Sequence, residues 1–291
     1  MRSKPFVSVI IPTYNREHLI QRAMESVLSQ TFSDFELLVI DDCSKDDTAS
    51  VVNHCDDPRV QYICNERNQG AAISRNRGAE LAHGELLAFL DSDDEWHHQK
   101  LRVQIHFTEQ CNLKKDWLCF SKAKILGMDE DIEVPNRPIK SGEHLSEYIF
   151  LDNQFIQTGT FMLPRGTFDQ FQFNPSIELF QDVEFCLRAF QSNVQFLFLN
   201  KVLSYWYCDK RWDRIIVKHD GWNRAKWYET CENLLTEKAK KAFIKELILS
   251  RIRTIEEKEK IKNFLKHQLL SREFSCTEII EIAKSFNTFI V

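Results

Sequence analysis

The sequence predicts an α/β protein whose sheet is covered by helices on both faces. Three short apolar segments are expected to be strands of that sheet: residues 7–11, 35–40 and 86–90. Fully apolar strands that alternate with helices are typical of a parallel sheet buried on both sides. The second strand runs into Asp41 and Asp42, and the third runs into Asp91 and the acidic residues at 93–95. Because ligands bind beyond the carboxyl ends of such strands, we expect the functional site at these acidic positions.

The other elements follow from the spacing of apolar residues along the chain. The first strand is expected to end at Pro12. The further elements expected in the first half are helices over 17–30, 48–54 and 71–82 and a strand over 60–63. Those expected in the second half are a strand over 155–163, a helix over 183–190, a strand over 194–199 and mainly helix from residue 220 onward.

Composition and charge exclude several classes of protein. The chain has 291 residues with a formal net charge of −5, and no apolar run approaches the roughly 18 residues of a membrane span. Nine cysteines are scattered without a C-x-x-C pair, and Met1 leads into the first strand without the apolar stretch of a signal peptide. We therefore expect a soluble, cytoplasmic protein with reduced thiols. Residues 1–200 hold 19 basic against 30 acidic residues, which argues against a nucleic-acid partner.

The rear of the chain is basic. Residues 201–272 hold 18 basic against 10 acidic residues, and four of the six tryptophans lie between positions 206 and 227. A basic segment with aromatic residues is typical of contact with an anionic membrane surface. A solvated helical face, stacking on acceptor sugars and packing of a helical tail are alternatives that the sequence leaves open.

The acidic run after the third strand is a candidate metal site. Asp91, Ser92, Asp93 and Asp94 contain a D-x-D motif and place hard oxygen ligands side by side. Carboxylates this close repel one another unless a cation neutralises them. Mg²⁺ and Mn²⁺ take one or two protein carboxylates and complete their shell with phosphate oxygens. The run therefore predicts a site that holds a diphosphate, and a solvent-exposed acidic turn is the alternative.

Five segments in a fixed order resemble the nucleotide-binding half of family 2 glycosyltransferases. They are VSVIIPTYNR at 7–16, LSQTF at 28–32, ELLVIDDCS at 36–44, NQGAAISRNRG at 68–78 and FLDSDD at 89–94. The resemblance implies the GT-A fold, a Rossmann-like mixed β-sheet flanked by helices, with a helical C-terminal extension. The expected glycosyltransferase domain is 1–215, with a nucleotide-sugar-binding half over 1–110 and an acceptor-binding half over 111–215, and the extension is 216–291.

The resemblance also implies roles on the donor side. Tyr14 would pack against a uracil base, and Asp42 would accept a hydrogen bond from the ring N–H of that base. The residues expected to bind the nucleotide-sugar are Pro12, Thr13, Tyr14, Asn15, Asp42, Arg75, Asp91, Ser92 and Asp93, and those expected to bind Mn²⁺ or Mg²⁺ are Asp93 and Asp94. A packing aromatic is the alternative for Tyr14, and a structural ion pair is the alternative for Arg75.

Inverting transfer needs a carboxylate that takes a proton from the acceptor hydroxyl. Family members carry it as the Asp of a Glu-Asp pair at the start of a helix; Asp182 matches this Asp, and Gln181 replaces the Glu. The helix dipole there would favour the ionised form that a base requires. A helix N-cap is the alternative for Asp182, and Glu184 is the second candidate for the base. The acceptor-side candidates are Thr158, Gly159, Gln181 and Glu184, with an ordinary strand as the alternative for the first two.

The resemblance thus implies an inverting, metal-dependent glycosyltransferase that moves one sugar from a UDP-sugar to a hydroxyl of a glycan acceptor. The acceptor is expected to be lipid-linked, in bacterial surface polysaccharide or lipopolysaccharide synthesis. The enzyme is expected to work at the inner face of the plasma membrane, held by its basic rear segment. Processive relatives use Q-x-x-R-W beside membrane spans; here Cys208 stands in place of the Gln, so we expect a non-processive enzyme. The alternative is a non-catalytic relative that binds a nucleotide-sugar or a glycan.

Overall fold

The structure, a computed structural model, describes residues 4–127, 130–208, 221–248 and 259–265. The chain divides into two compact units: Met1–Lys140 with Gln154–Asp209, and Ser141–Asn153 with Lys210–Val291. The expected boundary between residues 215 and 216 lies outside the described residues. Ser141–Asn153, which we expected in the acceptor-binding half, groups with the C-terminal unit.

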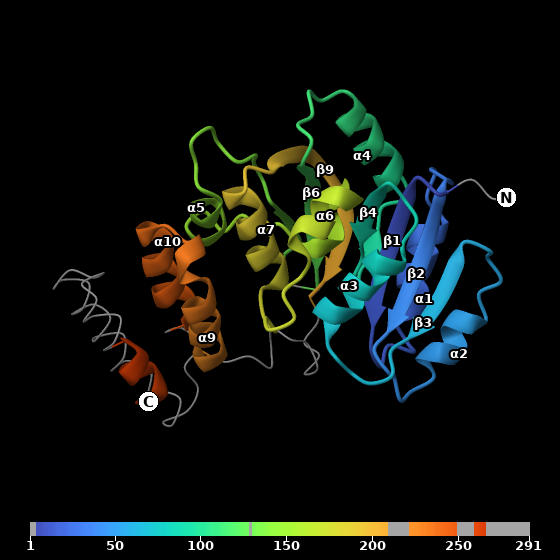
Figure 1. Cartoon of the computed structure of the whole chain (residues 1–291), viewed down its shortest axis with the longest axis horizontal. Helices are drawn as coiled ribbons and strands as arrows, with labels where there is room; N and C mark the ends of the chain where they lie inside the picture. Colours follow the sequence, from blue (N-terminus) through green and yellow to red (C-terminus); the bar gives the residue numbers. More distant parts are fainter. Residues whose placement is uncertain (1–3, 128–129, 209–220, 249–258, 266–291) are drawn as a thin grey trace. The chain divides into compact units, whose positions relative to one another are not determined.

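The first unit is built on one mixed β-sheet (Figure 1). In the described residues its nine strands are β1 Val7–Thr13, β2 Phe35–Asp41, β3 Val60–Cys64, β4 Leu86–Phe89, β5 Glu95–Trp96, β6 Trp117–Leu126, β7 Ile132–Val134, β8 Met162–Pro164 and β9 Gln195–Tyr207. The strand order is β3-β2-β1-β4-β8-β6-β9-β5, and β7 pairs with β6. β3, β2, β1 and β4 run parallel, and β8 is antiparallel to β4. The carboxyl ends of β1, β2 and β4 therefore meet at one edge of the sheet.

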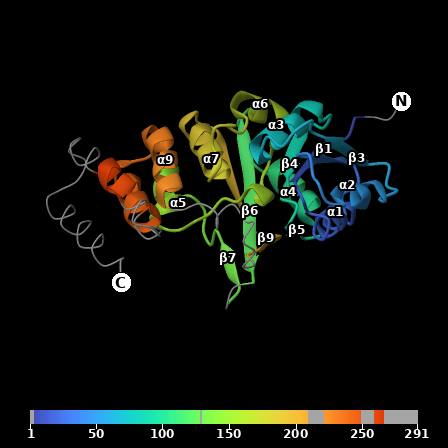
Figure 2. The same cartoon turned by 90° about the horizontal axis from the view of Figure 1, so that it is seen from below.

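Helices cover both faces of this sheet (Figure 2). They are α1 Ile20–Leu28, α2 Thr48–Asn53, α3 Ala71–Leu81, α4 Lys100–Glu109, α6 Arg165–Phe171 and α7 Gln181–Gln191. Figure 2 shows α3, α6 and α7 on one face. α1, α2 and α4 pack on the other, where Val27, Val52 and Ile105 join strand residues in one buried core. α3 approaches the sheet closely because residue 78 is glycine: a Cβ there would lie 2.5 Å from Cγ2 of Ile10. The predicted mixed sheet flanked by helices is confirmed.

Two strand predictions are wrong in detail. Pro12 does not end the first strand, which continues in register with β2 to Thr13. β4 pairs with β1 only as far as Ile10, so the missing N–H of Pro12 removes no hydrogen bond to β4. The strand expected over 155–163 is instead a 3₁₀ turn, η1 (Thr158–Thr160), followed by β8. Carbonyl oxygens of that turn accept hydrogen bonds from side chains 56 and 63 residues away, which no local pattern predicts.

The second unit is helical in its described residues, which confirms the predicted helical C-terminal region. Its elements are α5 Leu145–Phe150, α9 Gly221–Cys231, the 3₁₀ turn η2 Glu232–Leu234, α10 Glu237–Ala242 and the π-helix η3 Phe243–Ile248. Trp227 is buried and stacks on Phe243 with ring centroids 4.9 Å apart, so this tryptophan packs within the unit. Trp212 lies outside the described residues. Across the described parts of the chain, every helix is too short or too polar to cross a membrane.

Candidate active site

Hydrogen bonds through Asn15 join the loop after β1 to the loop after β2. The backbone N–H of Asn15 donates to Ser44 Oγ at 2.9 Å, and its Oδ1 accepts from the backbone N–H of Lys45 at 2.8 Å. In the same loop Tyr14 is 41% exposed. Thr13 is buried, and in the described part of the chain its hydroxyl has no hydrogen-bond partner. The exposed Tyr14 ring is a surface that suits a flat ligand, whereas the Thr13 hydroxyl is enclosed by the protein.

Three non-glycine residues around this edge of the sheet hold left-handed backbone conformations. Asn15 has φ 51°, Cys43 has φ 66° and Phe180 has φ 55°. Such conformations cost about 1–3 kcal/mol each and persist where surrounding contacts over-determine them, often at functional sites. Asn15 is itself a predicted site residue, and Cys43 and Phe180 directly adjoin the predicted residues Asp42 and Gln181. Asn153, Gln172 and Asn193 hold similar conformations elsewhere in the described residues, so these angles are consistent with a site at this edge but do not by themselves locate it.

Asp42 is buried, and its carboxylate is occupied by the chain itself. Its oxygens accept from the Asn65 side-chain amide at 2.8 Å and from the backbone N–H groups of Gln69 and Gly70 at 2.6–3.0 Å. These bonds hold the loop before α3 against the end of β2. Asp42 thus shapes this loop, and base recognition by its carboxylate stays a prediction.

Arg75 connects residues 91–94 after β4, which we call the acidic turn, to the start of α7. Its side chain is 8% exposed; Nη2 donates to Asp91 Oδ1 at 2.6 Å and Nη1 donates to Gln181 Oε1 at 2.8 Å. Gln181 Nε2 donates to the Ile177 carbonyl at 2.8 Å, so both ends of its amide have partners within the chain. The ion pair considered for Arg75 is therefore present. Three predicted residues from distant parts of the sequence lie in contact here.

Asp182 lies in the first turn of α7, and the N-cap of that helix is Phe180, so Asp182 does not cap it. Its Oδ1 accepts from the backbone N–H of Val183 at 2.9 Å. Burial raises the pKa of Asp182 to about 6, against the opposing effects of the Val183 N–H and the Arg75 charge; Asp91 adds a smaller rise. A carboxylate whose pKa lies this close to neutrality is suited to proton transfer.

Hydrogen bonds to the Asp94 side chain fix the acidic turn to the rest of the domain. The buried Asp94 carboxylate accepts from the Tyr207 backbone N–H at 3.0 Å and from Gln157 Nε2 at 2.6 Å. Burial, with the charges of Asp93 and Asp91, holds the pKa of Asp94 well above its usual value. A cation at Asp93 and Asp94 would relieve this repulsion. Within the described residues no three or more His, Cys, Asp or Glu side chains are grouped to hold a metal, so an ion here would also need oxygens from a ligand.

Four predicted residues are buried in ways that limit contact with a ligand. Ser92 lies buried within the acidic turn, and Thr158 and Gly159 are buried in η1. Glu184 is buried and pairs with Arg188 one helical turn later, with Nε–Oε1 at 2.6 Å and Nη2–Oε2 at 2.8 Å. The Glu184 carboxylate thus has a structural partner, which leaves Asp182 as the better candidate for the base.

Three residues that contact the acidic turn were missed in the sequence. Tyr207 and Gln157, which bind Asp94, lie 113 and 63 residues from it. The Arg22 guanidinium donates to the Asp93 carbonyl and lies 3.6 Å from the centroid of the Tyr207 ring. The aromatic run at the end of β9 is the one signal that could have extended this strand to the site, because aromatic residues favour strands. Neither Arg22 nor Gln157 has a local signal.

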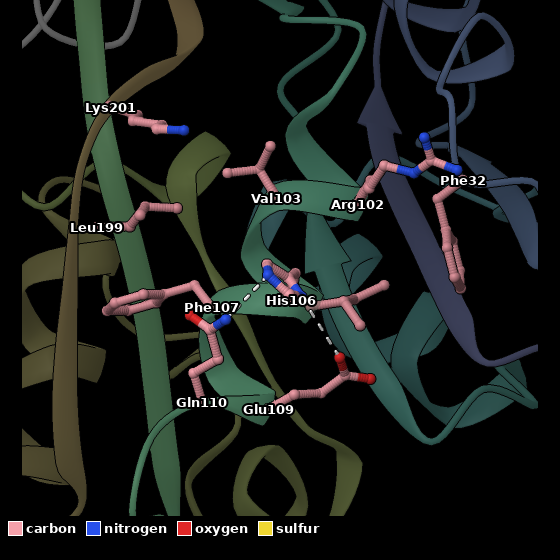
Figure 3. A pocket seen from close by; sticks show the side chains of 10 residues that line it. Phe32, Arg102, Val103, His106, Phe107, Glu109, Gln110, Leu199 and Lys201 are labelled. Atoms are coloured by element: carbon pink, nitrogen blue, oxygen red, sulfur yellow. Dashed lines mark hydrogen bonds and ion pairs between the residues drawn. The ribbon is translucent and has the colours of Figure 1, made fainter.

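A separate hollow of about 650 Å³ lies between α4 and β9 (Figure 3). Val103 and Phe107 line it from α4, and Leu199 and Lys201 line it from β9. No predicted site residue contributes to its walls, and its lining contains no cluster of carboxylates. We therefore place the candidate active site at the carboxyl ends of the strands and not in this hollow.

The chain resembles one family of proteins over much of its length. A family model described as "Glycosyl transferase family 2" matches residues 8–170. The chain is 31% identical over 247 residues to the putative teichuronic acid biosynthesis glycosyltransferase TuaG of Bacillus subtilis, spanning 83% of this chain and 94% of that protein. It is 45% identical over 107 residues to the UDP-Glc:alpha-D-GlcNAc-diphosphoundecaprenol beta-1,3-glucosyltransferase WfgD of Escherichia coli, spanning 37% of this chain and 42% of that protein. The structure of S. aureus TarS 1-349 in complex with UDP-GlcNAc matches with a TM-score of 0.70 and 20% identity, covering 90% of this chain and 81% of that chain. The last match is one of fold, and with the family match it confirms the predicted GT-A fold.

Proposed function

The chain belongs to glycosyltransferase family 2, and on that premise we propose that it moves one sugar from a UDP-sugar to a hydroxyl of a glycan acceptor, with inversion. The observation that carries this proposal is the link from Asp91 through Arg75 to Gln181, the residue beside Asp182. It brings a group that can accept a proton close to carboxylates that can hold a diphosphate through a cation. Inverting transfer needs that combination.

Asp182 is the general base in the proposed mechanism. Its carboxylate takes the proton of the acceptor hydroxyl while that oxygen bonds to the anomeric carbon. The bond between this carbon and the diphosphate oxygen breaks, and UDP leaves on the opposite face. With a pKa raised to about 6, Asp182 is a stronger base than an ordinary aspartate and is still mostly ionised at neutral pH. The charge of Arg75 helps to keep it ionised.

On the donor side, we propose that residues 12–15 bind the nucleotide. The exposed Tyr14 ring would lie against the uracil, and the buried Thr13 would support the loop that carries this ring. Asp93 and Asp94 are the residues that would hold Mn²⁺ or Mg²⁺, which would supply positive charge to the leaving diphosphate. The UDP-GlcNAc complex of TarS and the UDP-Glc in the name of WfgD support UDP as the nucleotide.

We propose a lipid-linked acceptor in the synthesis of a bacterial surface polysaccharide or lipopolysaccharide. The name of TuaG refers to teichuronic acid biosynthesis, and that of WfgD refers to a diphosphoundecaprenol acceptor. Because such an acceptor lies at the membrane, we propose peripheral contact at the cytoplasmic face through the basic C-terminal segment. Lys226, Lys245 and Lys262 are exposed there. Co-sedimentation with anionic vesicles, with and without charge reversal at these lysines, tests this contact.

Thermal unfolding tests the donor site. We expect UDP to raise the Tm in the presence of Mn²⁺, one UDP-sugar to raise it further, and EDTA to remove most of the rise. A ligand that binds only the folded state stabilises it by about 2.7 kcal/mol at 100 times its Kd. ADP and GDP are the matched controls. No rise with any uridine nucleotide would refute the proposed donor, and binding without transfer to any acceptor would favour a non-catalytic relative.

The pH dependence of transfer tests the base. We expect kcat/KM to rise as the pH increases through about 6, because Asp182 accepts a proton only when ionised and burial raises its pKa to about 6. The measurement is kcat/KM across the acid range at saturating Mn²⁺. A profile that stays flat down to about pH 4, where an ordinary aspartate titrates, would contradict the assignment.

A further inference from the structure

Three buried polar side chains behind the acidic turn take no part in the proposed chemistry. Trp96 of β5 and Lys100 and Gln104 of α4 are spaced four residues apart, and all three are buried. They bind successive carbonyl oxygens: Trp96 Nε1 donates to Gly159 at 2.7 Å, Gln104 Nε2 to Thr160 at 3.0 Å and Lys100 Nζ to Phe161 at 3.4 Å. We call Trp96, Lys100 and Gln104 the turn clamp.

Lys100 indicates that the turn clamp is more than ordinary core packing. Its side chain is fully buried, with Nζ 4.2 Å from the centroid of the Trp96 ring and 2.5 Å from Gln104 Oε1. None of the ion pairs in the described residues includes Lys100, and burial lowers its pKa to about 7. An apolar side chain of similar length would fill this space without desolvating an amine. The amine is therefore more readily explained by the carbonyl oxygen that it binds.

The clamped turn carries Gln157, which reaches the acidic turn. The backbone N–H and Oγ1 of Thr160 donate to the Gln157 carbonyl at 2.9 and 2.7 Å, so Gln157 is tied to the turn. The Gln157 amide lies back over the turn, since a Cβ at Gly159 would be 3.1 Å from its Oε1. Its Nε2 donates to Asp94 Oδ2 at 2.6 Å. A continuous chain of contacts thus runs from the turn clamp to a carboxylate of the proposed donor site.

We propose that Trp96, Lys100 and Gln104 are positioning residues that hold the turn so that Gln157 orients Asp94 for donor binding. Asp94 is buried, and the hydrogen bonds from Gln157 and the Tyr207 N–H fix the orientation of its carboxylate. A site whose groups are held by packed and hydrogen-bonded neighbours keeps its geometry, and small displacements weaken it. The proposal rests on the proposed donor function and adds residues to it that do not touch the donor.

Calorimetric binding of UDP in the presence of Mn²⁺ tests the proposal. Trp96→Phe keeps a ring but removes the bond to Gly159, and Gln157→Leu removes the bond to Asp94. We expect each to raise the Kd about fivefold, which corresponds to about 1 kcal/mol, the typical contribution of one such hydrogen bond. Thr108→Val is the matched control, because it removes a buried hydroxyl bond on α4, to the Ile105 carbonyl at 2.8 Å, without touching the turn. Its Kd should equal that of the wild type.

A double-variant cycle distinguishes positioning from general loss of stability. If Trp96 acts through Gln157, the variant with both substitutions should bind UDP as Gln157→Leu alone does. Gln104→Met, which removes the bond to Thr160, should match Trp96→Phe. If the two increases in the Kd for UDP multiply in the double variant, the proposal is overturned. It is also overturned if the Trp96 and Gln104 variants leave the Kd unchanged and lower only the Tm. A wild type that fails to bind UDP with Mn²⁺ would instead overturn the donor site, and the two failures are thereby separate.

Discussion

Replacing Asp182 with asparagine is expected to abolish transfer while leaving UDP binding unchanged. The amide keeps an oxygen that can accept from the Val183 N–H, as Oδ1 now does at 2.9 Å, but it cannot take a proton from an acceptor hydroxyl. Loss of a general base lowers the rate by about 10²- to 10⁴-fold. The measurements are initial rates of UDP release with acceptor present and calorimetric binding of UDP in the presence of Mn²⁺.

The same variant should fold at least as well as the wild type. Because the folded-state pKa of Asp182 is raised to about 6, the stability that its protonated form contributes is lost as the pH rises through that value. A neutral amide avoids this loss, so the Tm at neutral pH should not fall. Glu184→Gln is the matched control: a carboxylate two residues later is removed, and transfer should persist while its pairing with Arg188 weakens. Loss of transfer in Glu184→Gln with activity retained in Asp182→Asn would assign the base to Glu184.

The parallel part of the fold was predictable because each of its central strands is mostly apolar, with only Ser8 inside the apolar run of β1 and Glu36 inside that of β2. β1, β2 and β4 are buried at every position, which leaves no periodicity to mislead the assignment. The carboxylates follow β2 and β4 directly, so the topology alone brings Asp42 and Asp91 to one edge. β5 and β8 are two and three residues long and exist through their neighbours in the sheet. Segments this short carry no pattern that sequence reasoning can detect.

The order of motifs identified candidate residues, but it could not tell which of them have partners within the chain. Asp182 and Glu184 both lie in the first turn of α7 and look alike in the sequence. The i,i+4 spacing of Glu184 and Arg188 is itself a signal of their ion pair. By contrast, only the fold shows that Arg75, 106 residues before Gln181, binds the start of this helix. Partnerships of this range depend on the path of the whole chain. The same holds for Gln157, whose contact with Asp94 needs η1 where a strand was expected.

Replacing Arg75 with methionine is expected to lower kcat/KM roughly 100-fold, since misplacing a reacting group by about 1 Å has an effect of that order. Arg75 spans Asp91 and Gln181, and its loss frees the start of α7 from the acidic turn. The acid limb of the pH profile, which is the range where kcat/KM rises with pH as Asp182 ionises, should move to higher pH. The Arg75 charge lowers the pKa of Asp182 and the Asp91 charge raises it, so without Arg75 only the raising charge remains. The measurement is kcat/KM as a function of pH.

Two further variants separate charge from geometry at this position. Arg75→Lys keeps the charge, but one ammonium cannot span both partners as a guanidinium does, so the acid limb should return toward that of the wild type while the rate stays low. Arg188→Met removes a different arginine, which binds the Glu184 carboxylate on α7, and it should lower stability by roughly 2 kcal/mol without moving the limb. If Arg75→Met leaves the limb in place, or if Arg188→Met moves it equally, Arg75 does not tune the base. Burial and the Val183 hydrogen bond would then set the pKa of Asp182, and the ion pair of Arg75 with Asp91 would serve only the fold.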